Sequence, residues 1–194
     1  MSLLAPGRNL VLVGLMGSGK STVGAIIADR LQRQFVDTDA DVEAEMGVSI
    51  AELFATVGER RFRMLEAERI RHVAALRGKV IAVGGGAVVD PRNVTHLRGT
   101  GDMVLLDADP EELARRIADE RSSSPEAPER PLLAGAEDPT KVLAGLRARR
   151  DAAYLAAASH VVDTTDRTPE DVAQAVLDWA AHVPGLLSED ELPP

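Results

Sequence analysis

A short stretch near the start of the chain, GLMGSGKST at residues 14–22, combines three glycines with one lysine and three hydroxyl side chains. It matches the pattern G-x-x-x-x-G-K-[ST] at Gly14, Gly19, Lys20 and Ser21. Glycines let backbone N–H groups surround an anion without obstruction by Cβ atoms, and the start of a helix adds unpaired N–H donors and a positive dipole end. The stretch therefore predicts a phosphate-binding loop rather than a turn that is glycine-rich by coincidence.

A loop of this kind binds a nucleoside triphosphate together with Mg²⁺. Lys20 is expected to reach the β- and γ-phosphates, and the Ser21 hydroxyl is expected to ligate the metal. The residues predicted to contact the nucleotide in this loop are Gly17, Ser18, Gly19, Lys20, Ser21 and Thr22. The motif alone leaves open whether the phosphate is passed to water, to a protein or to a small molecule.

Two aspartates, in DTD at residues 37–39, follow the second apolar run of the chain. In an open α/β sheet the carboxyl ends of the strands border the ligand crevice, so both carboxylates are expected near the phosphates. We assign one of them to the metal sphere and the other to the acceptor hydroxyl. The alternative interpretation of Asp39 is a cap for the helix that follows, and a capping residue can also be catalytic.

Two arginines, Arg150 and Arg63, fall in apolar stripes of predicted helices. Arg150 recurs at intervals of three and four residues with an apolar set, Leu143, Leu146, Ala153 and Ala157. An inward-facing guanidinium needs an anionic partner, because leaving one unpaired costs about 3–5 kcal/mol. We therefore interpret both arginines as ligand-binding. The alternatives are a pair of Arg63 with Glu59 or Glu66, worth ~0.2–0.5 kcal/mol on a solvated helix, and a rim position for Arg150.

A run of three glycines at 84–86 follows the third apolar run and indicates close approach of the backbone to another segment or to a ligand. A polar stretch without periodicity at 118–135 predicts a lid loop, and Arg130 lies near its end. An arginine on a lid can neutralise the charge of a moving phosphoryl group, which is worth about 10³–10⁵ in rate. The four histidines show no ligand spacing and are interpreted as structural.

The elements that must position these residues are short strands alternating with helices. Apolar runs predict five strands, at Leu10–Val13, Phe35–Asp37, Val80–Val83, Met103–Leu106 and His160–Val162. Ser49 and Glu52 predict a capping box. Asp-Pro at 90–91, 109–110 and 138–139 and Thr-Pro at 168–169 each predict a helix cap followed by a first-turn proline. This alternation indicates βαβ units and a mostly parallel sheet.

Composition limits the class of protein. With 194 residues, 45% of them hydrophobic, the chain is expected to form one compact domain. A net charge of −9 without a basic patch excludes nucleic-acid binding, and the absence of cysteine excludes disulfides and thiolate metal sites. No apolar run approaches the ~20 residues of a membrane span. We expect a cytoplasmic protein that is a monomer, because no second apolar stripe is evident, with a loose acidic tail at 183–194.

Five segments together resemble the shikimate kinase family: GLMGSGKST, DTD, SIAELFATVGERRFRMLE, GGGAV and RPLLAG. Their order and approximate spacing also fit, over roughly residues 8–181. The resemblance implies a P-loop fold like that of nucleoside-monophosphate kinases, with a five-stranded parallel sheet of order 2-3-1-4-5, flanking helices and a mobile lid. It also implies transfer of the ATP γ-phosphate to the 3-hydroxyl of shikimate, within chorismate and aromatic amino-acid biosynthesis.

The same resemblance implies roles for individual residues. Asp39 would bind the substrate hydroxyls and act as the base, and Asp37 would lie near Mg²⁺. The substrate carboxylate would be held by Arg63 and Arg150. The remaining implied contacts are Gly85, Gly86, Phe54 and Phe62 around shikimate, Arg130 on the transferring phosphate, and Arg116 with the segment Arg167 to Pro169 beside the adenine.

Two rival functions remain open at this level. One is a sister kinase of the same fold that acts on gluconate or a nucleoside monophosphate. The segments DTD (37–39), GGG (84–86) and FR (62–63) favour shikimate kinase over this rival. The other is a non-catalytic ATP-binding regulator, against which the presence of Lys20, Ser21, Asp39 and Arg130 argues. This sequence departs from the family pattern at one place, because the stretch between Arg116 and Arg130 is longer. The features that this departure concerns are closure of the lid and the contact of Arg116 with adenine.

Overall fold

The structure, a computed structural model, describes residues 7–124 and 130–192. Its centre is a five-stranded, all-parallel sheet with strand order β2-β3-β1-β4-β5, as the resemblance implies. The strands are β1 (Asn9–Val13), β2 (Gln34–Asp37), β3 (Lys79–Ala82), β4 (Gly101–Asp107) and β5 (His160–Asp163). Each of the five predicted strands is present, with bounds that differ from the prediction by at most two residues.

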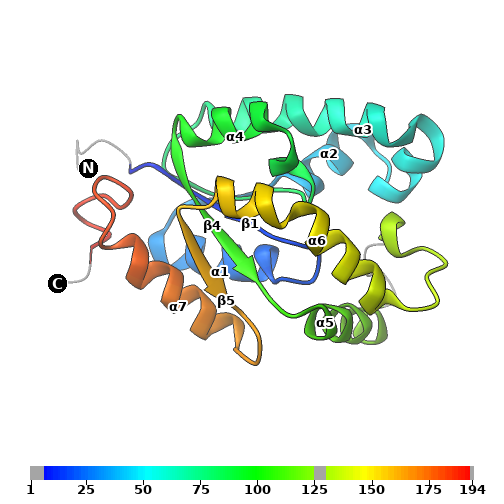
Figure 1. Cartoon of the computed structure of the whole chain (residues 1–194). Helices are drawn as coiled ribbons and strands as arrows, with labels where there is room; N and C mark the ends of the chain where they lie inside the picture. The colour runs from blue at the N-terminus through cyan, green and yellow to red at the C-terminus, as the bar shows by residue number, and fades with distance from the viewer. Residues whose placement is uncertain (1–6, 125–129, 193–194) are drawn as a thin grey trace.

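Helices cover both faces of the sheet (Figure 1). They are α1 (Lys20–Leu31), α2 (Thr38–Met46), α3 (Ile50–Ala74), α4 (Pro91–Arg98), α5 (Pro110–Ser123), α6 (Pro139–Ala157) and α7 (Pro169–Ala180), with 3₁₀ turns η1 (Ala87–Val89) and η2 (Pro131–Leu133). Helices α1 and α7 pack on one face, while α3, α4 and α6 pack on the other. None of the helices in the described ranges is long and apolar enough to cross a membrane.

Alternation along the strands explains these two layers. In β1, Val11 and Val13 belong to the apolar cluster beneath α3, α4 and α6, whereas Leu10 and Leu12 belong to the cluster beneath α1 and α7. Strand β4 divides its side chains between the two clusters in the same way. Strands buried on both faces are apolar at consecutive positions, which is why β1 reads as the continuous run NLVLV. The parallel arrangement places every strand's carboxyl end at one edge of the sheet.

The predicted helix starts are present. Ser49 accepts a hydrogen bond from the Glu52 N–H, and the Glu52 side chain accepts one from the Ser49 N–H, so the capping box is confirmed. Helices α4, α5, α6 and α7 each begin with proline after the predicted cap position. One cap differs in detail, because the side chain of Asp109 makes no capping hydrogen bond.

The stretch predicted as a lid loop is only partly irregular. Residues 118–123 continue α5, and 131–133 form η2, so the prediction of an aperiodic loop over all of 118–135 is wrong for these parts. Ion pairs on α5 at spacings of three and four residues, from Arg115 to Glu112 and Asp119, support a polar helix that carries little apolar periodicity. Residues 125–129 of the predicted lid lie outside the described residues.

The C-terminal segment differs from the loose tail expected from the sequence. Leu186 and Leu187 are buried in the cluster beneath α1 and α7. Glu191 pairs with Arg33, whose side chain is only 3% exposed, through Nε–Oε1 and Nη2–Oε2 distances of 2.6 Å. The segment packs because it supplies both apolar cover for the sheet and the anion that a buried guanidinium requires. Residues 193–194 lie outside the described residues.

Candidate active site

The glycine-rich loop connects β1 to α1 at the carboxyl edge of the sheet. Gly14, Gly17 and Gly19 have positive φ angles of 146°, 80° and 89°, so the loop depends on glycine conformations that other residues rarely adopt. The Ser18 hydroxyl oxygen is buried and has no hydrogen-bond partner among the described residues. An unpartnered buried hydroxyl beside N–H groups at a helix start is consistent with a site shaped for an anion.

Lys20 is the first residue of α1, and its ammonium group is held by the loop itself. Its Nζ donates to the carbonyl oxygens of Gly14, at 3.0 Å, and Leu15, at 2.9 Å. Burial lowers the pKa of Lys20 to about 8, while the nearby carboxylates of Asp39 and Asp37 oppose that fall. The ammonium group is therefore partly desolvated and can exchange carbonyl oxygens for phosphate oxygens.

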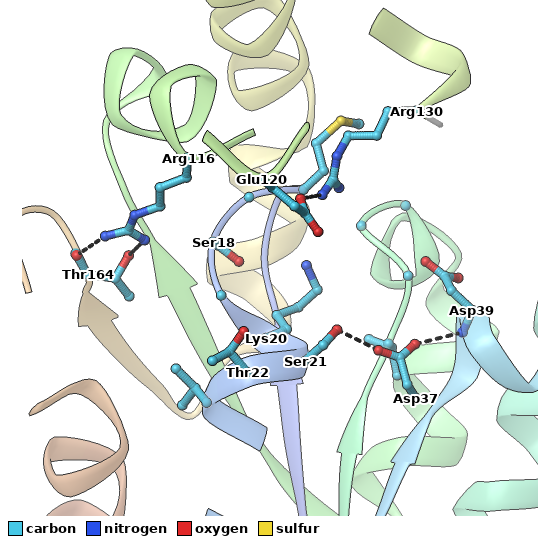
Figure 2. A pocket seen from close by; sticks show the side chains of 18 of the residues that line it. Ser18, Lys20, Ser21, Thr22, Asp37, Asp39, Arg116, Glu120, Arg130 and Thr164 are labelled. Atoms are coloured by element: carbon cyan, nitrogen blue, oxygen red, sulfur yellow. Dashed lines mark hydrogen bonds and ion pairs between the residues drawn. The ribbon is translucent and has the colours of Figure 1, made fainter. Parts of the chain in front are cut away.

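Asp37 joins the loop to the end of β2. The Ser21 hydroxyl donates to Asp37 Oδ2 at 2.6 Å, as drawn in Figure 2. The other carboxylate oxygen of Asp37 accepts from the N–H groups of Asp39 and Ala40 and so caps α2. The capping residue of this helix is therefore Asp37, and the interpretation of Asp39 as the cap is wrong. The carboxylate of Asp39 is therefore not used as a helix cap, and it lines the cavity.

Asp39 carries the most perturbed carboxylate that faces the cavity. Its Oδ1 atom is buried and lacks a hydrogen-bond partner among the described residues. Burial raises the pKa of Asp39 to about 7, and the neighbouring carboxylate of Glu66 adds to that rise, while Lys20 opposes it. A carboxylate with a pKa near neutrality is suited to accept a proton from a hydroxyl group.

The glycine run at 84–86 brings three segments together. The Gly84 N–H donates to the buried Thr38 hydroxyl at 3.3 Å, which ties the end of β3 to the end of β2. A Cβ atom on Gly84 would lie under 3.0 Å from oxygens of both Glu66 and Asp39, and one on Gly86 would lie 2.7 Å from the Arg63 guanidinium. The close approach predicted for these glycines is confirmed, and its physical reason is the space taken by charged side chains.

Arg63 on α3 pairs with both glutamates considered from the sequence, with Glu66 at 2.8 Å and Glu59 at 3.3 Å. Glu66 is 2% exposed, so its pair with Arg63 is not the weak solvated kind. The Glu66 Oε1 atom is itself buried without a partner among the described residues. Beside Arg63, Phe62 packs on Phe54 with ring centroids 4.8 Å apart.

Arg150 on α6 faces the glycine run from the opposite side. Its Nη1 donates to the Gly85 carbonyl at 2.8 Å, and the hydroxyl of Tyr154, one turn further along α6, donates to the same oxygen. Arg150 is therefore not a rim residue lying over apolar surface. Part of its guanidinium meets the backbone, and the residue also lines the cavity.

The remaining arginines occupy the far side of the cavity. Arg116 donates to the hydroxyl and carbonyl of Thr164 at 3.0 and 2.5 Å, as Figure 2 shows. It also donates to Glu112 at 2.7 Å, and these bonds together fix the guanidinium plane. Arg130 pairs with Glu120 at the end of α5. Arg167 donates to the carbonyl oxygens of Asp163 and Asp171.

One cavity of about 880 Å³ is lined by all eighteen residues predicted to bind ligands or to act in catalysis. They are Gly17, Ser18, Gly19, Lys20, Ser21, Thr22, Asp37, Asp39, Phe54, Phe62, Arg63, Gly85, Gly86, Arg116, Arg130, Arg150, Arg167 and Pro169. No role is predicted from the sequence for Glu120 or Tyr154, and Glu66 is predicted only as an alternative partner of Arg63. Helical spacing from Arg150 could have indicated Tyr154, whereas nothing local marks Glu120 as the partner of Arg130.

Comparison with known proteins identifies the family. The profile described as shikimate kinase matches residues 16–181. The chain belongs to the shikimate kinase family. It is 44% identical to a shikimate kinase of Geobacter sulfurreducens, over 91% of this chain and 92% of the relative, and 45% identical to one of Symbiobacterium thermophilum, over 88% and 94%.

A solved structure shows the same fold. The shikimate kinase from Acinetobacter baumannii, in complex with shikimate, superposes with a TM-score of 0.81 at 32% identity and covers 89% of this chain and 92% of that one. Enzymes of this family are ATP-dependent kinases that transfer phosphate to a hydroxyl group of shikimate, and such kinases generally use Mg²⁺. The family assignment made from five short segments of the sequence is therefore confirmed.

Proposed function

We propose that this chain transfers the γ-phosphate of ATP to the 3-hydroxyl of shikimate, giving shikimate 3-phosphate and ADP for chorismate and aromatic amino-acid biosynthesis. The observation that carries the proposal is the composition of the cavity of about 880 Å³. One side is a phosphate-binding loop, and the other presents two guanidinium groups, Arg63 and Arg150, around the perturbed carboxylate of Asp39. A small acceptor with one carboxylate and several hydroxyls complements that arrangement.

In this proposal the nucleotide occupies the side formed by the loop and α7. The N–H groups of residues 17–22 receive the phosphates, and Lys20 moves its ammonium group from loop carbonyls to the β- and γ-phosphate oxygens. The guanidinium plane of Arg116, fixed by Glu112 and Thr164, offers a flat surface to the adenine. Arg167 and Pro169 border the base at the start of α7.

The residues present also suit a magnesium ion. Mg²⁺ prefers hard oxygen donors, is bound by one or two protein groups and keeps the rest of its sphere for water and phosphate oxygens. Ser21 Oγ and Asp37 Oδ2 are such donors and lie 2.6 Å apart beside the loop. Within the described ranges no cluster of three or more metal-ligating side chains occurs, which fits this sparse mode of binding. Bound there, the ion would neutralise charge on the transferring phosphate.

The acceptor occupies the side between α3 and α6. Arg63 and Arg150 hold the carboxylate, with the backbone of Gly85 and Gly86 completing the contact. Phe54 and Phe62 form the apolar wall against the ring. Glu66 keeps Arg63 oriented through its ion pair of 2.8 Å. Arg150 has no carboxylate partner within the described ranges, so a bound anion supplies the partner that this half-buried cation requires, while Arg63 adds a second guanidinium to the contact.

The chemical step needs a base and a stabiliser of charge. Asp39 accepts the proton of the 3-hydroxyl as that oxygen bonds to the γ-phosphorus, and the bond from phosphorus to the bridging oxygen of ADP breaks. Lys20 and Arg130 stabilise the negative charge spread over the moving phosphoryl group. Arg130 reaches the phosphate after it exchanges its pair with Glu120. Catalysis thus consists of positioning and charge neutralisation.

A coupled assay of ADP release tests this function. Turnover with shikimate and MgATP is expected, with gluconate and nucleoside monophosphates at least about a hundredfold poorer by kcat/KM, because neither presents a carboxylate and hydroxyls in the same geometry. Calorimetry on the same sample measures binding independently. Tight binding of ATP and shikimate without turnover would support the rival of a non-catalytic regulator, and faster turnover of gluconate would support the sister kinase.

The setting of the enzyme is part of the same proposal. We infer one kinase domain over residues 8–182 that works as a monomer in the cytoplasm. Support comes from the single sheet that organises the whole cavity, and from the absence of cysteine, which suits a reducing compartment. Measurement of molar mass in solution with and without ligands tests the monomer.

A further inference from the structure

The carbonyl oxygen of Gly85 accepts hydrogen bonds from two side chains of one helix. Gly85 lies between the end of β3 and η1, in the wall of the cavity. Arg150 donates from Nη1 at 2.8 Å, and the Tyr154 hydroxyl donates to the same oxygen. Among the described residues, no other side chain donates to this carbonyl. The two donors are one turn apart on α6, so their guanidinium and phenol groups approach the peptide together.

The two donors have different surroundings. Tyr154 is 3% exposed and belongs to the larger apolar cluster, together with Val83 and Ala87 at either end of the glycine run. Burial raises the pKa of the Tyr154 phenol above its ordinary value, so the group stays a neutral donor around neutral pH. Arg150 is only half-buried and lines the cavity. One donor is therefore fixed in the core, and the other faces the space where the acceptor binds.

We propose that Tyr154 is a positioning residue that holds the Gly85 peptide in place while Arg150 exchanges the Gly85 carbonyl for the substrate carboxylate. The inference rests on the proposed function, because it assumes an acidic acceptor beside Arg150. A carbonyl oxygen has two lone pairs and tolerates the loss of one donor when a second remains. If the tyrosine hydroxyl were absent, the Gly85 carbonyl would lose its last side-chain donor whenever Arg150 turned to bind a carboxylate.

The size of the effect follows from that exchange. Leaving a buried acceptor without a partner opposes binding, and for a half-buried carbonyl we expect affinity for the acceptor to fall about 5–30-fold. The loss applies equally to the ground state and the transition state, because Arg150 holds the carboxylate in both. KM for shikimate should therefore rise while kcat stays within about twofold. Nucleotide binding, on the other side of the cavity, should not change.

The test is Tyr154→Phe, which removes one oxygen atom and retains the ring in the core. KM for shikimate, kcat and the dissociation constant for ATP are measured on folded protein. The matched control is Thr100→Val, which removes another hydroxyl that donates to a backbone carbonyl, at 2.5 Å to Ala74, at the opposite end of the sheet. Only the tyrosine variant is expected to raise KM for shikimate.

A second acceptor separates positioning from general loosening of the site. The methyl ester of shikimate lacks the anionic carboxylate, so it gives Arg150 little reason to leave the Gly85 carbonyl. The ratio of KM values between Tyr154→Phe and the unaltered chain should fall from about tenfold with shikimate to within about twofold with the ester. A merely structural role would leave the two ratios equal, and that result would overturn the proposal.

Tyr154 is the only tyrosine in the sequence, so its environment can also be followed without mutation. Shikimate should produce a tyrosine band in the near-ultraviolet difference spectrum of the unaltered chain, and ADP should not. Absence of that band overturns the proposal even if Tyr154→Phe does not fold. Failure of the unaltered chain to turn over shikimate would instead count against the proposed function itself.

Discussion

The two ends of the parallel sheet treat their polar groups in opposite ways. At the amino end, Asn9 is fully buried, donates to Leu76 O at 2.7 Å and accepts from Lys79 N–H at 2.9 Å. Arg33 at the same end meets the carboxylate of Glu191 and two backbone carbonyls. At the carboxyl end, oxygens of Ser18, Asp39 and Glu66 are buried without partners among the described residues.

We infer from this contrast that the amino end of the sheet serves mainly stability and the carboxyl end serves mainly ligand binding. The amino end pairs its buried groups internally, although Asp102 Oδ2 has only an ion pair, with Arg8 Nη1 at 3.0 Å, and no hydrogen bond among the described residues. We expect this end to contribute to the free energy of unfolding without touching substrates. The carboxyl end keeps charged and polar groups only partly satisfied, so ligands can complete them at the expense of stability in the free protein. Substitutions at the two ends should therefore change different quantities, and the following predictions test that separation.

The largest expected effect is at Asp39. Asp39→Asn should lower kcat about 10²–10⁴-fold, because the proton acceptor is lost. The same change should raise the free energy of unfolding at pH 8 by ~2–4 kcal/mol, because it removes a buried charge whose pKa in the folded protein is about 7. Kinetics and urea unfolding measure the two effects. The control, Asp29→Asn, alters an exposed aspartate of α1 and should change neither quantity.

The pH dependence has a definite sign. The folded-state pKa of Asp39, about 7, lies above the ordinary value of 3.8, so the folded chain retains a proton that the unfolded chain releases between these values. The contribution of Asp39 to stability is thus favourable at low pH and lost as pH rises from about 4 to about 7. Conversely, kcat/KM for shikimate should fall as pH drops below about 7. A flat profile between pH 5 and 8 would contradict the role of Asp39.

The next largest effect is expected at the amino end of the sheet. Glu191→Gln should lower the free energy of unfolding by about 3–5 kcal/mol, because it leaves the buried Arg33 guanidinium without its anion. Kinetic constants of the folded protein should stay within about twofold of their original values. The matched control is Glu189→Gln, the same charge change at an exposed residue of the same segment. A change in KM for shikimate in Glu191→Gln would break the separation between the two ends.

Arg150→Ala should change ligand binding at the carboxyl end of the sheet only. We expect the affinity for shikimate to fall about a hundredfold or more, because one of the two guanidinium groups opposing the carboxylate is lost, while ATP affinity stays within about twofold. Calorimetry with each ligand separately measures both values. Equal losses for the two ligands, or no loss for either, would argue against Arg150 as a carboxylate ligand.

The smallest effect is expected at the lid. Glu120 is an exposed partner of Arg130, and such pairs contribute ~0.2–1 kcal/mol. Glu120→Gln should therefore lower KM for ATP only about two- to fivefold, since Arg130 no longer has to exchange a carboxylate for phosphate. Asp119→Asn is the control, because Asp119 pairs with Arg115 rather than Arg130. A higher KM for ATP in Glu120→Gln would show that the pair positions Arg130 instead of competing for it.

Much of this molecule can be read from local sequence. The glycine-rich loop, the capping box at Ser49 and the first-turn prolines are formed by residues a few positions apart, so their geometry follows from short-range rules. The helical spacing of Arg150 likewise indicated that it faces inward. All eighteen residues predicted to bind ligands or to act in catalysis line the cavity. Those in the loop at 17–22, the two aspartates 37 and 39 and the glycines 85 and 86 do so because motifs at the ends of parallel strands converge on one edge of the sheet.

Several contacts that local patterns did not predict join residues far apart in the sequence. Tyr154 meets a carbonyl 69 positions away, and Arg33 meets a carboxylate 158 positions away. Such pairings depend on which strands lie side by side and on which helix crosses them, and no local spacing encodes that order. The local sequence therefore determines which charged and polar side chains are present in each motif. Only the tertiary structure determines which of them find a partner within the fold and which remain free to bind a ligand.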